Sequence, residues 1–250
     1  MIVIKDEAAV KRMRTAGRVT AAVCAKVSQS IYPGVTTREI DEYAASLISE
    51  AGARSAFLGY RGYPGNICVS VNDEVVHGLP GARRVQVGDI VSLDVGVLVD
   101  GYMGDMATTV AVGVKDAGVL RLLAQTEQAL QAGIRQACAG ARLSDVSHAI
   151  EKVARGAGFS VVREFVGHGI GREMHEDPQI PNFGPPGRGP VLRPGMTLAI
   201  EPMLNMGRAG VDILEDGWTV VTCDHKYSAH FEHTIVIGTD GPEILTRLDD

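Results

Sequence analysis

Apolar and small side chains recur every three or four positions in four stretches of the chain, which is the spacing of an amphipathic helix. A capping-box pattern at Thr36 and Glu39 opens the second stretch, directly after Pro33 and Gly34 have ended the first. The pattern therefore predicts four helices, grouped as two consecutive pairs. In chain order they cover residues 6–31, 36–51, 116–139 and 144–157.

Runs rich in valine and isoleucine predict strands between and after the helices. Residues 67–71 form one such strand, and residues 90–112 form two strands joined by a two-residue turn at residues 100–101. The last predicted strand covers residues 233–237 and is followed by a turn at residues 240–242. We expect no further element after that turn.

The expected hairpin determines where its two acidic side chains lie. The numbers of paired residues sum to 201 in such a hairpin, so Asp94 faces Ala107. Asp105 then projects from the same face as Asp94, about 7–8 Å away at Cα. Two carboxylates this close on a buried face repel each other unless a cation lies between them.

The second half of the chain repeats the order of the first. Equivalent positions differ by 106 or 107 residues, and each match joins elements of the same kind. The matched pairs are Gly34 and Gly140, Gly52 and Gly158, and residues 88–94 and 195–201. We therefore predict an α+β fold in which residues 1–250 form one domain, built from two pseudo-symmetric halves at about residues 1–113 and 114–250.

Each half carries two acidic residues beside its predicted strands. Asp94 and Glu201 each end a strand, and Asp105 and Glu232 each stand at the start of a later one. A single acid of this kind is more simply explained as an exposed carboxylate on an edge strand. That explanation fails for the set, because Asp94 and Glu201 follow apolar runs, where an unpaired acid is costly. If the two halves pack their sheets together, the four carboxylates meet near the axis between them.

Two histidines seven residues apart, His168 and His175, lie in the glycine-rich segment 165–178, which we interpret as a loop. Its alternating glycines allow the backbone to approach other groups closely or to adopt positive φ. In isolation the segment is explained equally well as a connection with two surface histidines. The four carboxylates favour a site instead, since imidazoles and carboxylates together form a ligand set for a metal.

Four carboxylates and one or two imidazoles suit Mn, Fe(II), Co or Zn better than copper or a lone Ca²⁺. Because the acids outnumber the other ligands, we expect two divalent ions that share bridging carboxylates, about 3.5–4 Å apart. Such a pair activates water between two Lewis acids, which favours hydrolysis of a carbonyl or phosphoryl bond.

Composition and charge exclude several classes of protein. The chain is 45% hydrophobic and 22% charged, as in a globular domain, and its net charge of −6 gives no support to nucleic-acid or membrane binding. No apolar run reaches transmembrane length and the first residues lack the features of a signal peptide, so we expect a cytoplasmic protein. The cysteines form no C-x-x-C pair, so the sequence predicts neither a disulfide framework nor a cysteine zinc site.

The candidate residues and their spacing resemble the methionine aminopeptidases, metallopeptidases of the pita-bread fold. The resemblance extends from the first helix to Thr246, and no long insertion separates His175 from Glu201, which is similar to the short bacterial type I form. It implies two pseudo-symmetric α+β halves around a central curved antiparallel sheet. The residues that carry it are His77, Asp94, Asp105, Glu201, Glu232 and the run from His168 to Pro178.

The resemblance implies a role for each candidate ligand. Asp94 would chelate one ion, His168 and Glu201 would bind the other, and Asp105 and Glu232 would bridge the two. Glu201 would also take a proton from the attacking water as the general base. The free α-amine of the substrate would coordinate a metal, which explains why a single N-terminal residue is removed.

The resemblance further implies that His77 and His175 are catalytic residues that contact the substrate. His175 would lie beside the scissile carbonyl and His77 near the amide nitrogen of the second residue. Phe57 stands where a small cysteine is common, so we expect a change in pocket volume. The other pocket positions are Tyr60, Tyr63, Cys68, Met174, where an aromatic is common, and Trp218. A monovalent cation is expected at Asn72, Glu74 and Ser228.

The implied activity is removal of the N-terminal methionine from nascent proteins and peptides whose second residue is small. The expected partners are nascent polypeptide N-termini near the ribosome, and we expect a monomer. Two alternatives stay open. One is a proline dipeptidase, aminopeptidase P or creatinase-like enzyme, although these usually carry a large N-terminal domain. The other is a non-catalytic relative that binds a protein partner, although such relatives typically lack ligands that are all present here.

Overall fold

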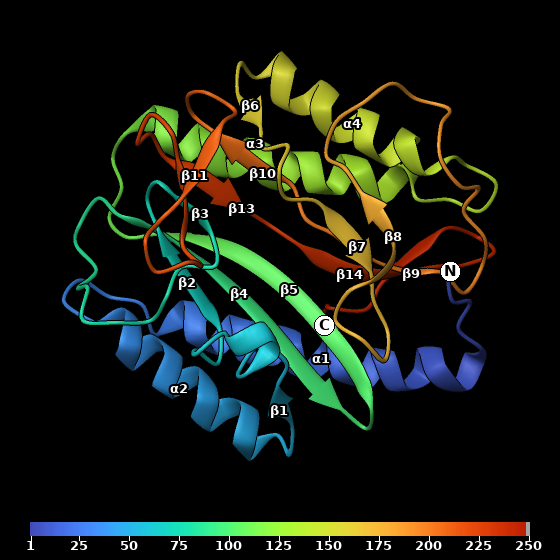
Figure 1. Cartoon of the computed structure of the whole chain (residues 1–250), viewed down its shortest axis with the longest axis horizontal. Coiled ribbons are helices and arrows are strands. Elements are labelled where there is room, and N and C mark those ends of the chain that lie inside the picture. The colour runs from blue at the N-terminus through green and yellow to red at the C-terminus, as the bar shows by residue number, and fades with distance from the viewer. Residues whose placement is uncertain (249–250) are drawn as a thin grey trace.

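The computed structural model describes residues 1–248 and places the strands between two layers of helices (Figure 1). Helices α1 (Glu7–Gln29) and α2 (Thr37–Glu50) lie along one side of the strands, and α3 (Ala117–Gln136) and α4 (Leu143–Gly156) lie along the opposite side. All four predicted helices are confirmed, with slightly shifted ends. None of the helices in residues 1–248 is both long and apolar enough to cross a membrane.

Side chains just before the first turns fix where the helices begin. The Asp6 carboxylate accepts the N–H of Ala9 at 2.8 Å, which caps α1. The predicted capping box of α2 is present, since the Thr36 hydroxyl accepts the N–H of Glu39 and the Glu39 carboxylate accepts the N–H of Thr36. These caps satisfy N–H groups that have no partner inside a helix.

The strands form two larger and two smaller sheets, in which the paired strands are antiparallel. The first sheet has the order β1-β4-β2, with β5 paired to β4; its strands are β1 (Arg54–Ser55), β2 (Cys68–Val71), β4 (Ile90–Val99) and β5 (Tyr102–Ala111). The second has the order β15-β14-β9-β7-β8; its strands are β7 (Gly167–Gly169), β8 (Glu176–Ile180), β9 (Thr197–Ile200), β14 (His233–Ile237) and β15 (Pro242–Ile244). The smaller sheets are β13-β10-β6 and β11-β12-β3; their strands are β3 (Glu74–Val76), β6 (Ser160–Val161), β10 (Met203–Asn205), β11 (Val211–Ile213), β12 (Val220–Thr222) and β13 (Ser228–His230).

The predicted hairpin of β4 and β5 is confirmed in turn and in register. Asp100 and Gly101 have φ of 47° and 77°, as a two-residue hairpin turn requires. Asp94 pairs with Ala107, and Asp105 pairs with Gly96. Asp94 and Asp105 lie inside their strands, however, and not at strand ends as expected, because the ladder of paired residues continues past both to the turn.

The two larger sheets are joined where β5 meets the segment around β14. The N–H of Glu232 donates to the carbonyl of Ala107 at 2.9 Å. The Thr234 hydroxyl donates to the carbonyl of Asp105 at 2.8 Å and accepts the N–H of Asp105 at 3.1 Å. This joint places the acid of β5 next to the acid that precedes β14.

Each helix pair covers its own core. Val27 of α1 and Ile40 of α2 pack with Leu93 and other residues of the first sheet. Ile150 of α4 packs in a second core that includes Leu198 of β9. Burial of such side chains stabilises the fold by roughly 1.5–3 kcal/mol each, so both sheets form rigid supports for the residues that line their joint.

One expected boundary is wrong, because a strand does follow the turn at residues 240–242. This strand, β15, pairs with β14 and places Ile244 opposite Ile235. The apolar run that could have predicted this strand is short. Leu245, which follows the strand, is nevertheless 1% exposed, and its N–H donates to the carbonyl of Thr234. Tertiary packing therefore selects a strand that its own residues only weakly favour.

The expectation of a loop around both histidines is also partly wrong. His168 lies on β7, and His175 lies in the connection before β8. The close approach predicted for the alternating glycines is confirmed, since a Cβ on Gly167 would collide with the carbonyl of Ala199 and one on Gly169 with the carbonyl of Asp177. The glycines therefore let β7 fit between β8 and β9, with His168 held between them.

Candidate metal centre and adjoining pocket

The predicted ligands converge in one cavity of about 140 Å³, at the joint of the two larger sheets. Ligand atoms of Asp105, His168 and Glu232 lie within 4.8 Å of one another. The cavity is lined by all five predicted metal ligands together with Phe57, Tyr60, Arg61, Tyr63, Cys68, His77, His175 and Trp218. The structure thus brings residues from distant parts of the chain to a single place.

His168 is oriented by the backbone next to it. Its Nδ1 lies 2.9 Å from the carbonyl of Gly169, a contact that assigns the ring proton to Nδ1. Nε2 then faces Glu201 Oε1 at 3.4 Å and Asp105 Oδ2 at 3.8 Å. Burial lowers the pKa of His168 to about 3, so the ring is neutral at pH 7. A lone pair aimed at carboxylate oxygens is repulsive unless a cation lies between them.

The four carboxylates, like His168, lie where a cation is needed to balance them. Burial raises the pKa of Asp94 to about 7, and it raises the pKa values of Asp105, Glu201 and Glu232 well above the ordinary range of a carboxyl group. Within residues 1–248, Asp94 Oδ1, Asp105 Oδ1 and Glu232 Oε1 are buried without a hydrogen-bond partner. Orphaned carboxylate oxygens next to an imidazole lone pair fit divalent metal ions of the predicted kinds.

An aromatic wall adjoins the carboxylates. The rings of Tyr63 and Trp218 meet edge to face with centroids 5.1 Å apart, and Phe57 meets Tyr63 at 6.5 Å. The Tyr63 hydroxyl donates to the carbonyl of Gly78 at 2.9 Å, which keeps the ring in place. Cys68 pairs with Asp94 across β2 and β4, so this residue of the pocket shares a sheet with the ligands Asp94 and Asp105. The cavity is far below the roughly 300 Å³ of a site for a drug-sized molecule, so it suits one side chain.

Two further histidines border the cavity. The ring of His175 stacks on Tyr60, and its Nδ1 lies 2.8 Å from the Tyr60 hydroxyl. His77 has φ of 59°, a left-handed backbone conformation that is uncommon for a non-glycine residue. Burial lowers the pKa of His77 to about 4, so this ring is also neutral at pH 7.

Some predicted site residues are not among those that line the cavity. Met174 is 1% exposed and packs with Phe57 and Tyr63 in the cluster beneath the pocket, and it is not among the lining residues. The residues expected to hold a monovalent cation also lie outside the lining, although the N–H of Ser228 donates to the carbonyl of Asn72. The Glu74 carboxylate pairs with Arg83 at 2.7 Å. That cation site stays a prediction.

Sequence reasoning missed two residues of the site. Arg61 lines the cavity from the turn after Tyr60 and has φ of 50°. His230 lies beside Glu201, with Nε2 3.7 Å from Glu201 Oε2. The signal that could have found His230 is its position two residues before Glu232, since alternate residues of an extended chain share a face.

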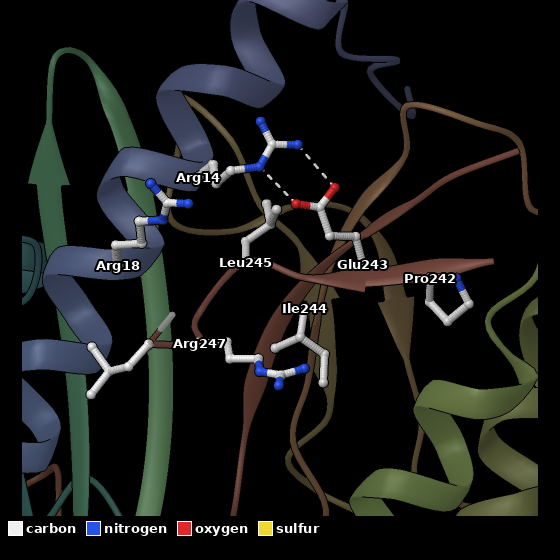
Figure 2. A pocket seen from close by; sticks show the side chains of 8 residues that line it. Arg14, Arg18, Pro242, Glu243, Ile244, Leu245 and Arg247 are labelled. Atoms are coloured by element: carbon white, nitrogen blue, oxygen red, sulfur yellow. Dashed lines mark hydrogen bonds and ion pairs between the residues drawn. The ribbon is translucent and has the colours of Figure 1, made fainter. Parts of the chain in front are cut away.

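A larger cavity of about 540 Å³ lies between α1 and β15 (Figure 2). Arg14 and Glu243 form two hydrogen bonds across it, of 2.7 and 2.9 Å. It contains none of the predicted ligands, and Arg14 and Glu243 of its lining already pair with each other. We therefore assign the chemistry to the smaller cavity.

The segment that carries His175 is held by a buried ion pair. Glu176, the next residue, pairs with Lys5, and the two side chains are 11% and 4% exposed. The same carboxylate accepts the N–H of Arg172 at 2.9 Å. Lys5 is itself fixed, because its N–H donates to the carbonyl of Gly195 at 2.8 Å. The first residues of the chain thus fasten the connection between β7 and β8.

We expect the change Lys5→Met to lower the free energy of unfolding by about 3 kcal/mol, because it leaves the buried Glu176 without its cation. Urea denaturation measures this. The matched control Lys11→Met, on the exposed face of α1, should change the value by less than about 0.5 kcal/mol. Equal stabilities of the two variants would contradict the prediction.

Buried carboxylates and a neutral histidine around one cavity, on an α+β scaffold, define a metal-dependent enzyme. Comparison with known proteins gives its class. The sequence pattern of metallopeptidase family M24 matches residues 11–239. Methionine aminopeptidase 1 of Bacillus subtilis is 50% identical over 248 residues, which cover 99% of this chain and 100% of the relative.

Solved structures agree with the sequence comparison. The crystal structure of methionine aminopeptidase from Thermotoga maritima superposes with a TM-score of 0.97 at 47% identity, covering 99% of this chain and 100% of that one. Prolidase from Pyrococcus furiosus has a TM-score of 0.79 at 21% identity, covers 99% of this chain and 66% of that one, and shares the fold alone. The chain belongs to metallopeptidase family M24 and has the pita-bread fold. Within the family it groups with the methionine aminopeptidases.

Proposed function

We propose that this protein is a methionyl aminopeptidase, a metal-dependent hydrolase that removes the N-terminal methionine from nascent proteins and peptides whose second residue is small. The observation that carries the proposal is the union, in one cavity, of the five-residue ligand set and an aromatic wall. Membership of family M24 and 50% identity to a methionine aminopeptidase support it. The expected substrate is the free N-terminus of a chain.

The ligand set fits two divalent ions. Asp94 would hold one ion, His168 and Glu201 the other, and Asp105 and Glu232 would bridge both, in agreement with the orphaned oxygens and the lone pair of His168. When bound, the ions supply Lewis acidity that polarises the scissile carbonyl and generates a nucleophile from water at neutral pH. Manganese, cobalt, iron and zinc all suit these donors.

The remaining roles in the reaction belong to individual side chains of the protein. A Glu201 carboxylate oxygen takes the proton of the attacking water and later returns a proton to the leaving amine. With the Tyr60 hydroxyl as the donor to Nδ1 of His175, 2.8 Å away, Nε2 of that ring would be left as an N–H donor for the scissile carbonyl. His77 contacts the amide nitrogen of the second substrate residue as a neutral ring.

The aromatic wall holds the methionine side chain. Tyr63, Trp218 and Cys68 offer polarisable surface that suits a thioether. Phe57 occupies part of the same space, so the pocket should accept an unbranched side chain and reject a larger one. This closure would limit cleavage to chains whose first side chain fits the pocket.

The setting of the enzyme follows from the same proposal. Nascent chain N-termini would be met in the cytoplasm near the ribosome, by a monomer without direct contact to nucleic acid. A monovalent cation held near Asn72, Glu74 and Ser228 would support β2, β3 and β13 from outside the cavity.

The decisive test is release of free methionine by chelator-stripped protein, with and without added Mn²⁺ or Co²⁺. We expect metal-dependent release from Met-Ala-Ser, and at least about 100-fold slower release from Met-Leu-Ser, because a bulky second residue displaces the scissile bond. An Ala-Pro dipeptide serves as the control substrate. Cleavage of Ala-Pro alone would identify a proline dipeptidase, and no cleavage with any metal would favour a non-catalytic relative.

A further inference from the structure

His230 is a buried imidazole that none of the roles above uses. It ends β13 and is 1% exposed. Its Nε2 has no hydrogen-bond partner among the described residues 1–248, and this atom lies 3.7 Å from Glu201 Oε2. A buried polar atom without a partner costs roughly 1–3 kcal/mol, so its retention at this place requires an explanation.

The backbone of His230 is held on two sides. Its N–H donates to the Thr109 hydroxyl at 3.0 Å, and that hydroxyl donates to the carbonyl of His230 at 2.8 Å. Pairing of β13 with β10 places His230 opposite Met203. The imidazole therefore projects from a fixed point on the joint of the sheets, as a group that orients another residue must.

The Glu201 carboxylate lies between two imidazoles. Oε1 is 3.4 Å from Nε2 of His168, and Oε2 is 3.7 Å from Nε2 of His230. The second distance exceeds a hydrogen bond by roughly half an ångström. The terminal torsion of a glutamate is soft, so a small rotation of the carboxylate brings Oε2 within reach of an N–H on His230.

We propose that His230 is a positioning residue, which donates a hydrogen bond from Nε2 to Glu201 Oε2 and turns the other oxygen of that carboxylate toward His168. The proposal rests on the proposed function for the assignment of Glu201 as ligand and base. It extends that function by a group that touches neither metal nor substrate. Residues that orient a ligand in this way change metal affinity or activity by about 10- to 100-fold.

The test compares three substitutions by titrating Mn²⁺ into chelator-stripped protein in a calorimeter. We expect His230→Leu to raise the Kd by about 10- to 100-fold, because the carboxylate loses its orienting donor. His230→Met fills the same space and gives the same result if the leucine variant does not fold. His230→Gln places an amide N–H at a similar reach, so its Kd should stay within about threefold of the wild type. Circular dichroism reports folding for each variant.

A second readout separates positioning from packing. In peptide hydrolysis, His230→Leu should lower kcat with KM nearly unchanged, and His230→Gln should restore it. In a Glu201→Ala background, which has no side-chain acceptor at this position, His230→Leu should change the Kd by less than about twofold. Wild-type affinity in both apolar variants, or no rescue by glutamine, would overturn the proposal. Absence of methionine release by the wild type, with the affinity pattern intact, would instead overturn the aminopeptidase function.

Discussion

Replacing Glu201 by glutamine is expected to lower kcat by about 10³-fold or more, because one change removes a metal ligand and the general base together. The amide cannot take a proton from water at neutral pH, and it is a poorer ligand than a carboxylate. Steady-state release of methionine from a Met-Ala-Ser peptide, at saturating Mn²⁺, measures the loss.

The matched control for this change is Asp212→Asn, which also neutralises one acid, on the exposed strand β11. It should leave kcat within about twofold of the wild type. Metal content after dialysis should fall in the Glu201 variant and not in the control. A Glu201→Gln enzyme that retained a tenth of the wild-type kcat would exclude this residue as the base.

Metal-free protein is expected to lose stability as the pH rises from about 4 to above 7. Burial raises the pKa of Asp94 to about 7 in the folded state, whereas the unfolded chain has an ordinary value near 4. Between these values the folded state binds more protons than the unfolded state, so the free energy of unfolding falls with rising pH. The loss of stability begins above the pKa of Asp94 in the unfolded chain and is complete above its pKa in the folded state. For this one carboxyl it is on the order of 4 kcal/mol.

Urea denaturation of chelator-stripped protein at pH 5 and pH 8 measures the effect. Added Mn²⁺ should stabilise the protein far more at pH 8 than at pH 5, since binding releases the protons that the carboxyl groups retain. The variant Asp94→Asn should show a flatter dependence of stability on pH, and Asp212→Asn should not. A stripped wild type that is equally stable at both values would show that the carboxylates do not need a cation.

The helices and the central hairpin could be predicted because their signals are local. Helical spacing, a capping box at Thr36 and a turn at Asp100 and Gly101 each act within a few residues, and each is present in the structure. The strand β15 could not be predicted, since it exists by pairing with β14. The division into two halves at about residue 113 stays a prediction.

The candidate site was predictable in part for a similar reason. The register of β4 and β5 placed Asp94 and Asp105 on one face by arithmetic alone, and the pairing confirms it. The position of His168 required knowledge of which strands flank it. The glycines on either side of His168 indicate that another backbone comes close, but they do not indicate which strand that backbone belongs to. His230 was missed since its importance comes from a contact with Glu201 across two strands.

The joint between β5 and the start of β14 has a consequence for how the protein comes to be active during its own synthesis. Asp94 and Asp105 lie in the first sheet, whereas Glu232 and the strand that secures it, β14, are made only after both helix pairs. A partly synthesised chain can fold its first sheet. One edge of β5 then lacks its partner segment, and the set of metal ligands is incomplete. Activity should therefore arise in a single late step, and fragments that end before Glu232 should neither retain metal nor protect β5 from proteolysis.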